Sequence, residues 1–482
     1  MNPLLMISAA ALAAAALTGC ATGLAKNDST ETPTLAAASA DVEKTGHIIT
    51  IGDVHEYRLA NGLKILIKED HRAPIVVSQI WYKTGASYES SGTTGVAHVL
   101  EHMMFKGTKT LGPNEFSRII AANGGRENAF TGQDYTAYFQ QLEKSRLPIS
   151  FELEADRMAN LNLRAEDFAK EVKVVMEERR MRTEDRPRSL TYEHFTATAF
   201  VNSPYHHPII GWMNDLENMN VDDMRNWYKD WYAPNNATLV VAGDVDAKEV
   251  FELAQKTYGK VKARPIPVVK PQTEFEQKGI KRIVVKAPAQ VPYMIMGYKV
   301  PVVTTAKTDW EPYALEMLAN ILDAGESSRF AKELVRGQQI VTSIGAGYNM
   351  YSRLGDLFIF DGTPAKGKTV EEVENAIRAQ IKKIKTELVN QTELDRIKAQ
   401  VVASKVYEKD SLFYQAMQMG TLATVGLDWQ LMDQFVERLR AVTPEQVQAV
   451  AKKYLIDDYL TVAVLDPQST PVATNGGHSH AH

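Results

Sequence analysis

Residues 95–105 read Gly95-Val96-Ala97-His98-Val99-Leu100-Glu101-His102-Met103-Met104-Phe105. The apolar residues recur at helical spacing, which predicts a helix over this segment. On that helix His98 and His102 share one face, with Glu101 beside them. Two imidazoles one turn apart fit two corners of a zinc tetrahedron, and the neighbouring carboxylate is placed to accept and return a proton. The H-x-x-E-H spacing therefore predicts a zinc site that still lacks one ligand, normally a carboxylate.

A later helix, expected from Ala165 to about Thr183, offers the missing carboxylate. It carries Glu171, Glu177 and Glu178. Glu171 and Glu178 lie about two helical turns apart and share a face, whereas Glu177 is one step round and is expected in solvent. The alternative is that the residues of the H-x-x-E-H motif coincide by chance on a polar helix face. The apolar flanks of the motif argue against this, because they bury its helix.

Strands and helices alternate on both sides of the motif. Before it, Asn61-Gly62 separates two alternating runs, which predicts a β-hairpin. Further expected elements of the first half are strands 75–82, 135–141 and 238–243 and helices 114–122 and 147–161. After a stretch with three prolines, 262–279, the order recurs more loosely: strands 282–286 and 291–300, helices 310–324 and 327–335, strands within 340–360, a helix 370–388 and a final strand 459–465. This recurrence predicts a structural duplication.

These elements predict an α+β protein of two homologous domains, each a mostly antiparallel sheet flanked by helices. The length of 482 residues exceeds one ordinary domain. The expected divisions are a signal peptide at 1–20, a flexible tether at 21–45, an N-terminal metal-binding domain at 46–260, a linker at 261–281, a homologous domain without the motif at 282–467 and a histidine-rich tail at 468–482. The net charge of -5 and pI near 6.2, without a basic stripe, argue against a nucleic-acid partner.

The start of the chain has the pattern of an export signal. Residues 3–19 form a short alanine-rich apolar run that ends in Leu17-Thr18-Gly19-Cys20. The run is short for a bilayer span and suits a secretory signal, although Met1 to Met6 contains no Lys or Arg. Its ending resembles the lipobox of bacterial lipoproteins, where cleavage leaves a lipidated cysteine. We expect a lipid anchor through Cys20 and a periplasm-facing position at the outer membrane; the alternatives are a plain cleaved signal or an unmodified thiol.

The segment from Gly95 to Thr108 resembles the signature of the pitrilysin-type zinc peptidases, or inverzincins. This family includes the mitochondrial processing peptidase β-subunit, insulin-degrading enzyme and bacterial two-domain members. The resemblance covers nearly the whole mature chain and is also carried by Asn61-Gly62, Asn123-Gly124-Gly125, Asn128 to Thr131, Asp134-Tyr135-Thr136, Leu153 to Met158, Pro204-Tyr205 and Pro208 to Gly211. It implies a zinc metalloendopeptidase with one Zn²⁺ per chain, whose two domains form half of a clamshell.

The resemblance also implies roles for single residues. Zinc is expected on His98, His102 and Glu178, since Glu178 stands at the spacing of the family's third ligand. Glu101 is expected to act as general base and then as proton donor. Glu171 matches the supporting acidic residue of the family, which lies behind the ligands.

The expected substrate strand is Asn128-Ala129-Phe130-Thr131. By resemblance it lies at a sheet edge facing the metal, where an extended peptide adds through backbone hydrogen bonds. For Asn128 the alternative is a turn residue that satisfies its own backbone.

The second half departs from the family pattern at one pair of residues. Self-sufficient members supply an Arg and a Tyr there, which bind the substrate and the oxyanion. In this chain Val335 stands at the Arg position and Thr342 at the Tyr position. Arg336 is one residue off, and Tyr348 and Tyr351 do not keep the spacing. In two-chain members a metal-free homologue provides the pair, so we expect this chain to be the catalytic subunit of a heterodimer.

The chain ends in His478-Ser479-His480-Ala481-His482. Alternating histidines there either capture zinc loosely or form a solvated tail. Other functions compatible with the sequence are a non-enzymatic envelope scaffold or assembly subunit of the same fold, a zinc-buffering protein, and a zinc hydrolase of non-peptide amides. The complete motif favours the peptidase.

Overall fold

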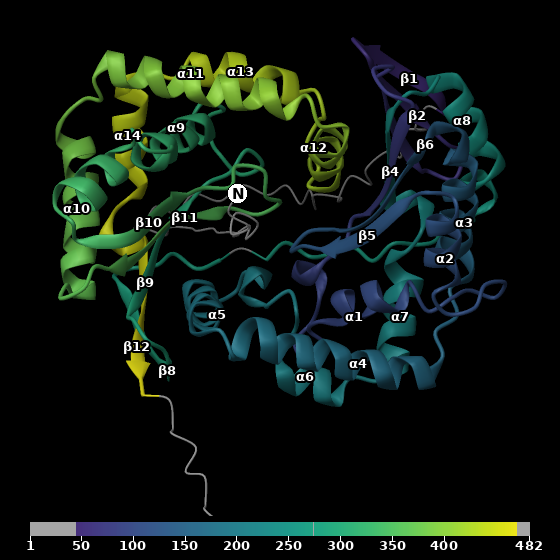
Figure 1. Cartoon of the computed structure of the whole chain (residues 1–482), viewed down its shortest axis with the longest axis horizontal. Helices are drawn as coiled ribbons and strands as arrows, with labels where there is room; N and C mark the ends of the chain where they lie inside the picture. Colours follow the sequence, from purple (N-terminus) through teal and green to yellow (C-terminus); the bar gives the residue numbers. More distant parts are fainter. Residues whose placement is uncertain (1–44, 273, 470–482) are drawn as a thin grey trace, which may run out of the picture.

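The computed structural model describes residues 45–272 and 274–469, which form two halves side by side (Figure 1). Cys20 and the terminal histidines lie outside these residues. The first half contains β1 (Gly46–Ile51), β2 (Val54–Arg58), β3 (Lys64–Glu69), β4 (Ile75–Tyr82), α1 (Val96–Met103), α2 (Glu115–Ala122), β5 (Arg126–Thr131), β6 (Thr136–Glu143), α3 (Leu147–Asn160), α4 (Ala165–Arg179), α5 (Pro187–Ala199), α6 (Met213–Asn218), α7 (Val221–Trp231), β7 (Ala237–Gly243) and α8 (Ala247–Lys256). The second contains β8 (Lys281–Pro288), β9 (Tyr293–Val300), α9 (Glu311–Asp323), β10 (Val341–Gly347), β11 (Asp356–Pro364), α10 (Val370–Thr386), α11 (Gln391–Glu408), α12 (Leu412–Thr424), α13 (Leu431–Arg440), α14 (Pro444–Tyr454) and β12 (Leu460–Gln468).

The two sheets repeat one topology. The first has the strand order β1-β2-β3-β7-β4-β6-β5, and the second has the order β10-β11-β9-β12-β8. In the first sheet the parallel pair is β3 with β7, and in the second it is β8 with β12; the other pairs of described strands are antiparallel. The last strand of each half, β7 or β12, therefore lies parallel to β3 or β8, and β10 corresponds to β5 at the end of its sheet. The predicted α+β class and the duplication are confirmed.

Each sheet is covered on one face by its own helices and on the other by a helix from the opposite half. Helices α3 and α8 pack on the first sheet, while α12 of the second half packs on β4 and β7. In return, α5 of the first half packs on β8, β9 and β12. Because both faces of the sheets are covered at their centres, β7 and β9 are buried along their whole length. Strands buried on both faces have largely continuous apolar sequences.

A close approach of helix α12 to strand β4 joins the halves. A Cβ atom at Gly420 would lie 2.1 Å from the Trp81 indole, so the helix reaches this distance only with glycine. The Trp81 ring also meets Phe130 and Tyr135 edge-on, at centroid distances of 5.3 and 5.0 Å. The second half therefore packs directly behind the strand that the sequence predicts to bind substrate.

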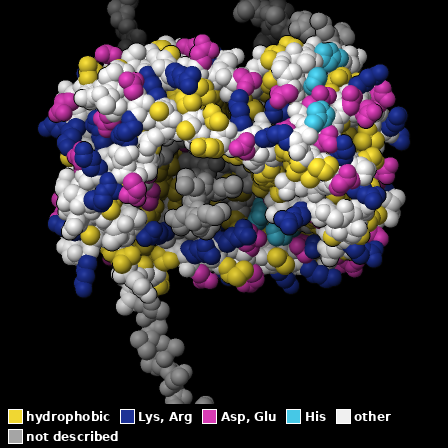
Figure 2. Space-filling view, turned by 45° about the horizontal axis from the view of Figure 1, so that its top comes forward, with side chains coloured by type: hydrophobic (Ala, Val, Ile, Leu, Met, Phe, Trp, Pro, Cys, Tyr) yellow, Lys and Arg dark blue, Asp and Glu magenta, His cyan; other side chains and the backbone are white. Residues whose placement is uncertain are grey.

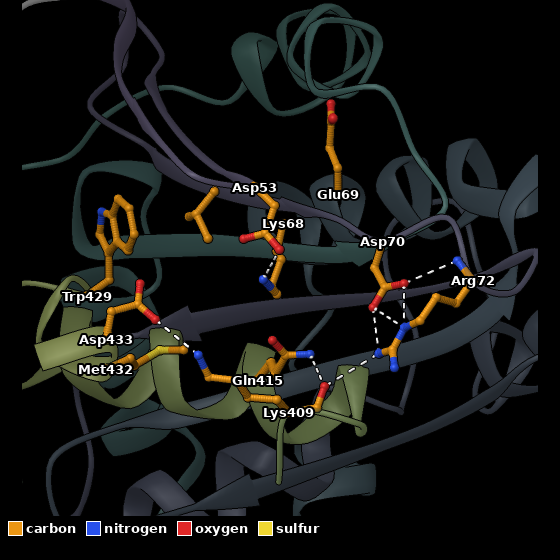
Figure 3. A pocket seen from close by; sticks show the side chains of 11 residues that line it. Asp53, Lys68, Glu69, Asp70, Arg72, Lys409, Gln415, Trp429, Met432 and Asp433 are labelled. Atoms are coloured by element: carbon orange, nitrogen blue, oxygen red, sulfur yellow. Dashed lines mark hydrogen bonds and ion pairs between the residues drawn. The ribbon is translucent and has the colours of Figure 1, made fainter. Parts of the chain in front are cut away.

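Charged side chains also link the halves, around a cavity of about 380 Å³ (Figure 3). Arg72 of the first half pairs with Asp70 and reaches Asp410 of the second at 3.2 Å. Lys409 and Asp433 pair across the cavity from them at 3.3 Å. The Arg72–Asp410 ion pair therefore connects the two halves at the lining of the cavity.

The predicted elements near the motif are confirmed within a few residues, including the β2–β3 hairpin around Asn61-Gly62. Two segments that were predicted as α-helix have π-helical geometry instead. Helix α4 ends at Arg179 and goes on as a π-helical turn, Arg180–Glu184, and the helix expected at 327–335 is a π-helical segment, Phe330–Gly337. Helices α5 to α8 and strand β1 were not predicted. The domain boundary predicted at 261–281 remains a prediction. Helices α5 and α12 each pack on the sheet of the opposite half, so the two halves are not separated cleanly at the linker.

Candidate metal centre

Helix α1 begins at a fixed point because a buried carboxylate binds its first N–H groups. Glu89 accepts hydrogen bonds from Gly95 N at 2.7 Å and Ala97 N at 2.9 Å. Gly95 has a φ of 88°, and a Cβ there would lie 2.9 Å from Gly211 Cα. Glycine therefore allows the turn at 208–211 to press against the start of the helix. Desolvation raises the pKa of Glu89 to about 8, which reflects the burial of this carboxyl group.

The two faces of α1 have different environments. Val99, Leu100 and Met103 are fully buried in the core of the first half. The opposite face, which carries the motif residues, packs toward α4 and β5. The amphipathic pattern thus fixes the rotation of the helix and directs both histidines toward the carboxylates of α4.

Three donor atoms from α1 and α4 converge. His98 Nε2 lies 3.8 Å from Glu178 Oε1, and His102 Nε2 lies 3.6 Å from Glu178 Oε2. The two imidazole rings are 5.0 Å apart between centroids and nearly perpendicular. All three ligand atoms lie within 4.8 Å of one another. Among residues 45–272 and 274–469 this is the one set of His, Cys, Asp or Glu side chains with such convergence.

The chemistry of this donor set fits zinc. Zinc bonds of about 2.0–2.1 Å in tetrahedral geometry place ligand atoms roughly 3.3 Å apart, close to the separations seen here. Burial, with the nearby charge of His102, lowers the pKa of His98 to about 4, so its imidazole is neutral and able to bind a metal. The facing His102 lowers the pKa of Glu178, which keeps that carboxylate ionised. Two imidazoles and one carboxylate leave a fourth position open, as in catalytic zinc sites.

Glu171 lies behind His102 rather than inside the donor set. Its Oε2 is 3.4 Å from His102 Nδ1, and its Oε1 is 2.8 Å from Lys106 Nζ. Burial lowers the pKa of His102, but the surrounding carboxylates outweigh it and hold the pKa above its ordinary value. A carboxylate on the outer nitrogen orients a histidine ligand and increases its basicity. His98 has no such partner among residues 45–272 and 274–469, where its Nδ1 is buried without a hydrogen bond.

Glu101 faces the edge strand β5. The Thr131 hydroxyl donates a hydrogen bond of 2.5 Å to Glu101 Oε2. Desolvation raises the pKa of Glu101, which makes its carboxylate a stronger base than an exposed glutamate. Among the described strands, β5 pairs with β6 alone and is the last strand of its sheet. Its outer backbone edge is therefore available beside Glu101.

Comparison with known proteins identifies the family of this chain. Residues 64–212 match the family model described as "Insulinase (Peptidase family M16)", and residues 218–401 match that of the "Peptidase M16 inactive domain". The chain is 32% identical over 418 residues to the zinc protease PqqE of Helicobacter pylori, covering 85% of this chain and 92% of that protein. The chain belongs to peptidase family M16. The predicted pitrilysin-type resemblance is confirmed.

Other members of family M16 agree with this assignment. The chain is 24% identical over 434 residues to the probable mitochondrial-processing peptidase subunit beta of Arabidopsis thaliana, covering 87% of this chain and 80% of that one. A crystal structure of a Helicobacter pylori protease matches with a TM-score of 0.81 and 30% identity, covering 86% and 100%. The periplasmic protease PqqL of Escherichia coli shares the fold, with a TM-score of 0.73 and 18% identity over 88% of this chain and 48% of that one.

The four residues of the predicted substrate strand in this M16 chain point in different directions. Thr131 contacts Glu101, whereas Phe130 packs on Trp81 on the other face of the sheet. The Asn128 side chain accepts from the N–H of Ala129 at 2.9 Å, which agrees with the alternative that it satisfies its own backbone. An incoming peptide would have to displace this amide to reach the Ala129 N–H.

Two charged residues of the site were missed by the sequence analysis. Lys106 pairs with Glu171, and Arg182 in the π-helical turn pairs with Glu178 Oε1. Each is four residues beyond a predicted site residue, His102 or Glu178, although Lys106 lies past the end of α1 and Arg182 lies in the π-helical turn. The four-residue spacing was the feature of the sequence that could have indicated both contacts. The spacing alone does not assign these residues to the site, because both also fit a solvated surface.

The second half brings no arginine or tyrosine to the two family positions. Val335 packs against the core of the second half, and Thr342 lies on β10. The Tyr348 hydroxyl is engaged, since it donates to Pro301 O at 2.6 Å. α9, the helix that corresponds to α1, contains no histidine.

The hollow between the halves, with histidine side chains at its lower right, is visible in Figure 2.

Across the described residues, 45–272 and 274–469, none of the helices is both long enough and apolar enough to cross a membrane.

Substituting the carboxylate ligand tests the donor set. Glu178→Gln is expected to lower zinc affinity by more than about 100-fold, because losing even an outer-shell partner costs about 10- to 100-fold. The matched control is Glu177→Gln, whose side chain is 64% exposed and pairs with Arg180. The measurement is metal content after dialysis against a competing chelator. Equal zinc retention by the two variants would contradict the assignment.

Proposed function

We propose that the chain is a zinc metalloendopeptidase that cleaves extended peptides or unfolded polypeptides in the bacterial envelope. The observation that carries this proposal is the convergence of His98, His102 and Glu178, with Glu101 on the same helix facing a free strand edge. One Zn²⁺ per chain would be held by the three donors. Glu171 would fix the orientation of the second imidazole from behind.

Zinc, when bound, supplies a Lewis acid that polarises the scissile carbonyl and lowers the pKa of water. Glu101 accepts a proton from the attacking water while the water oxygen bonds to the carbonyl carbon. The same proton then passes from Glu101 to the leaving nitrogen as the C–N bond breaks. Thr131 holds one carboxylate oxygen of Glu101, so the other oxygen is free for the proton transfer.

The substrate would bind as an added strand along β5. Its backbone would pair with the outer edge at residues 128–131, which selects an extended conformation rather than a particular sequence. The direction of the side chains supports this assignment, because Thr131 links the strand to the base while Phe130 anchors it to Trp81. Substrates with stable secondary structure would bind poorly.

A metal-free homologous subunit is proposed to complete the site. The support is the presence of Val335 and Thr342 where self-sufficient family members place the Arg and Tyr. The similarity to a protein named as the β-subunit of a mitochondrial-processing peptidase points the same way. The partner would donate hydrogen bonds to the developing oxyanion.

The envelope location is proposed from residues 17–20, whose lipobox-like ending would leave Cys20 lipidated at the outer membrane. The shared fold with a protein named as a periplasmic protease supports an envelope site.

Replacing the general base separates chemistry from metal binding. Glu101→Gln is expected to lower turnover about 100- to 10,000-fold, the usual contribution of a positioned base, while zinc content stays unchanged. Cleavage of an unstructured peptide, with and without a chelator, is the measurement. Glu177→Gln serves as the control and should keep full activity. Retained turnover in Glu101→Gln would refute this mechanism.

The partner proposal has its own test. The single chain is expected to cleave unstructured peptides about 100- to 1,000-fold more slowly than a mixture with its homologue, the usual effect of a missing oxyanion donor. The measurement compares turnover of the purified chain with that of material co-purified from native membranes. Equal rates would exclude a partner that completes the site.

A further inference from the structure

The hairpin tips of the two halves meet beside the candidate active site. Strand β5 ends at Thr131, and the turn 132–135 leads into β6. The corresponding strands of the second half, β10 and β11, are joined by the loop 348–355. β5 is directed toward the second half in Figure 1. The contact between these tips rests on one buried carboxylate, Asp134, which is 4% exposed.

Asp134 is enclosed by donors from both halves. From the first half, the Ser87 hydroxyl donates to its Oδ1 at 2.6 Å and the Tyr205 hydroxyl donates to its Oδ2. From the second half, Arg353 donates its backbone N–H at 3.1 Å and its Nε at 3.0 Å. The guanidinium also reaches Ser87 Oγ at 2.7 Å and lies 4.3 Å from the ring centroid of Tyr88. Arg353 is the cation paired with this carboxylate, and a buried carboxylate needs such a partner.

The same turn is held close to the residues that follow β4. The N–H of Ala86 donates to Gly132 O at 3.1 Å, and the N–H of Ser87 donates to Gln133 O at 2.8 Å. A Cβ at Gly85 would lie 2.3 Å from Gly132 O, so this approach requires glycine. Gly132 directly follows Thr131, whose hydroxyl holds Glu101. A continuous set of contacts thus runs from Arg353 through Asp134 and the turn to the base.

We propose that Arg353 is a positioning residue that, through Asp134, fixes strand β5 and the Thr131–Glu101 hydrogen bond. This inference rests on the proposed peptidase function and assigns the second half a part in it. Arg353 is not a substitute for the absent oxyanion arginine, because its guanidinium is already engaged by Asp134, Ser87 and Tyr88. It acts on the reaction only through the strand.

The test uses Arg353→Met in the full chain. A matched control is Arg329→Met, which removes a partly buried arginine paired with Glu393 at 2.7 Å within the second half. Arg353→Met is expected to lower turnover about 100-fold, as expected for a displaced catalytic group, with zinc content unchanged. Amide hydrogen exchange across residues 126–131 should quicken about 10-fold or more. Arg329→Met should stay within about twofold of the wild type in both measurements.

A double-mutant cycle distinguishes positioning from general destabilisation. If Arg353 acts through Thr131, then Thr131→Val combined with Arg353→Met should lower turnover no further than the more damaging single change. Multiplicative losses, or equal exchange in Arg353→Met and Arg329→Met, would overturn the inference. If Arg353→Met does not fold, Arg353→Lys keeps the charge without the paired contacts, and it should still quicken exchange across 126–131.

The wild-type chain provides the remaining distinction. Absence of chelator-sensitive cleavage in every preparation of the wild type would reject the proposed function. The exchange measurement does not depend on cleavage, so it still decides whether Arg353 holds β5. Active wild type together with unchanged turnover in Arg353→Met would reject only the role of Arg353.

Discussion

The candidate site depends on keeping a carboxylate and two imidazoles close together in a largely buried position. Glu178 lies 3.8 and 3.6 Å from the two histidines of α1, so none of these donors fully satisfies another. Such an arrangement is costly unless a cation joins it, and it persists only if both helices are anchored elsewhere. Glu89 fixes the start of α1. Arg179 fixes the end of α4 through two hydrogen bonds to Glu193 and one to Gly211 O.

Those two anchors meet at one place. Gly211 lies against Gly95 at the start of α1, and its carbonyl accepts from Arg179 at the end of α4. The turn 208–211 therefore sets the position of one metal helix relative to the other. The π-helical turn that follows α4 also brings Arg182 to Glu178, which supplies a positive charge beside the carboxylate. Unusual helical geometry of this kind is frequent at functional sites.

Local patterns were sufficient to predict much of this centre. His98 and His102 follow from helical spacing, and Glu171 and Glu178 follow from the family resemblance together with their shared helix face. Contacts between distant segments were not predictable in the same way. The packing of α12 on Trp81 leaves no periodic signal, and Gly420 by itself resembles any helix glycine. The pairing of Asp134 with Arg353 joins residues far apart in the chain through two irregular loops.

The second half has the same strand order as the first but does not contain the H-x-x-E-H motif. Its helix α9 occupies the place of α1 without a histidine, while α12 covers the first sheet and the β10–β11 loop reaches Asp134. The second half, which matches the family's inactive domain, thus contacts the first half through packing and one buried ion pair.

Anomalous X-ray diffraction at the zinc edge, on crystals of the full chain grown with zinc, tests the central claim most directly. The account predicts one strong peak within bonding distance of His98 Nε2, His102 Nε2 and the Glu178 carboxylate. A crystal with zinc only elsewhere, for example at the C-terminal histidines, or with no zinc between α1 and α4, would contradict it.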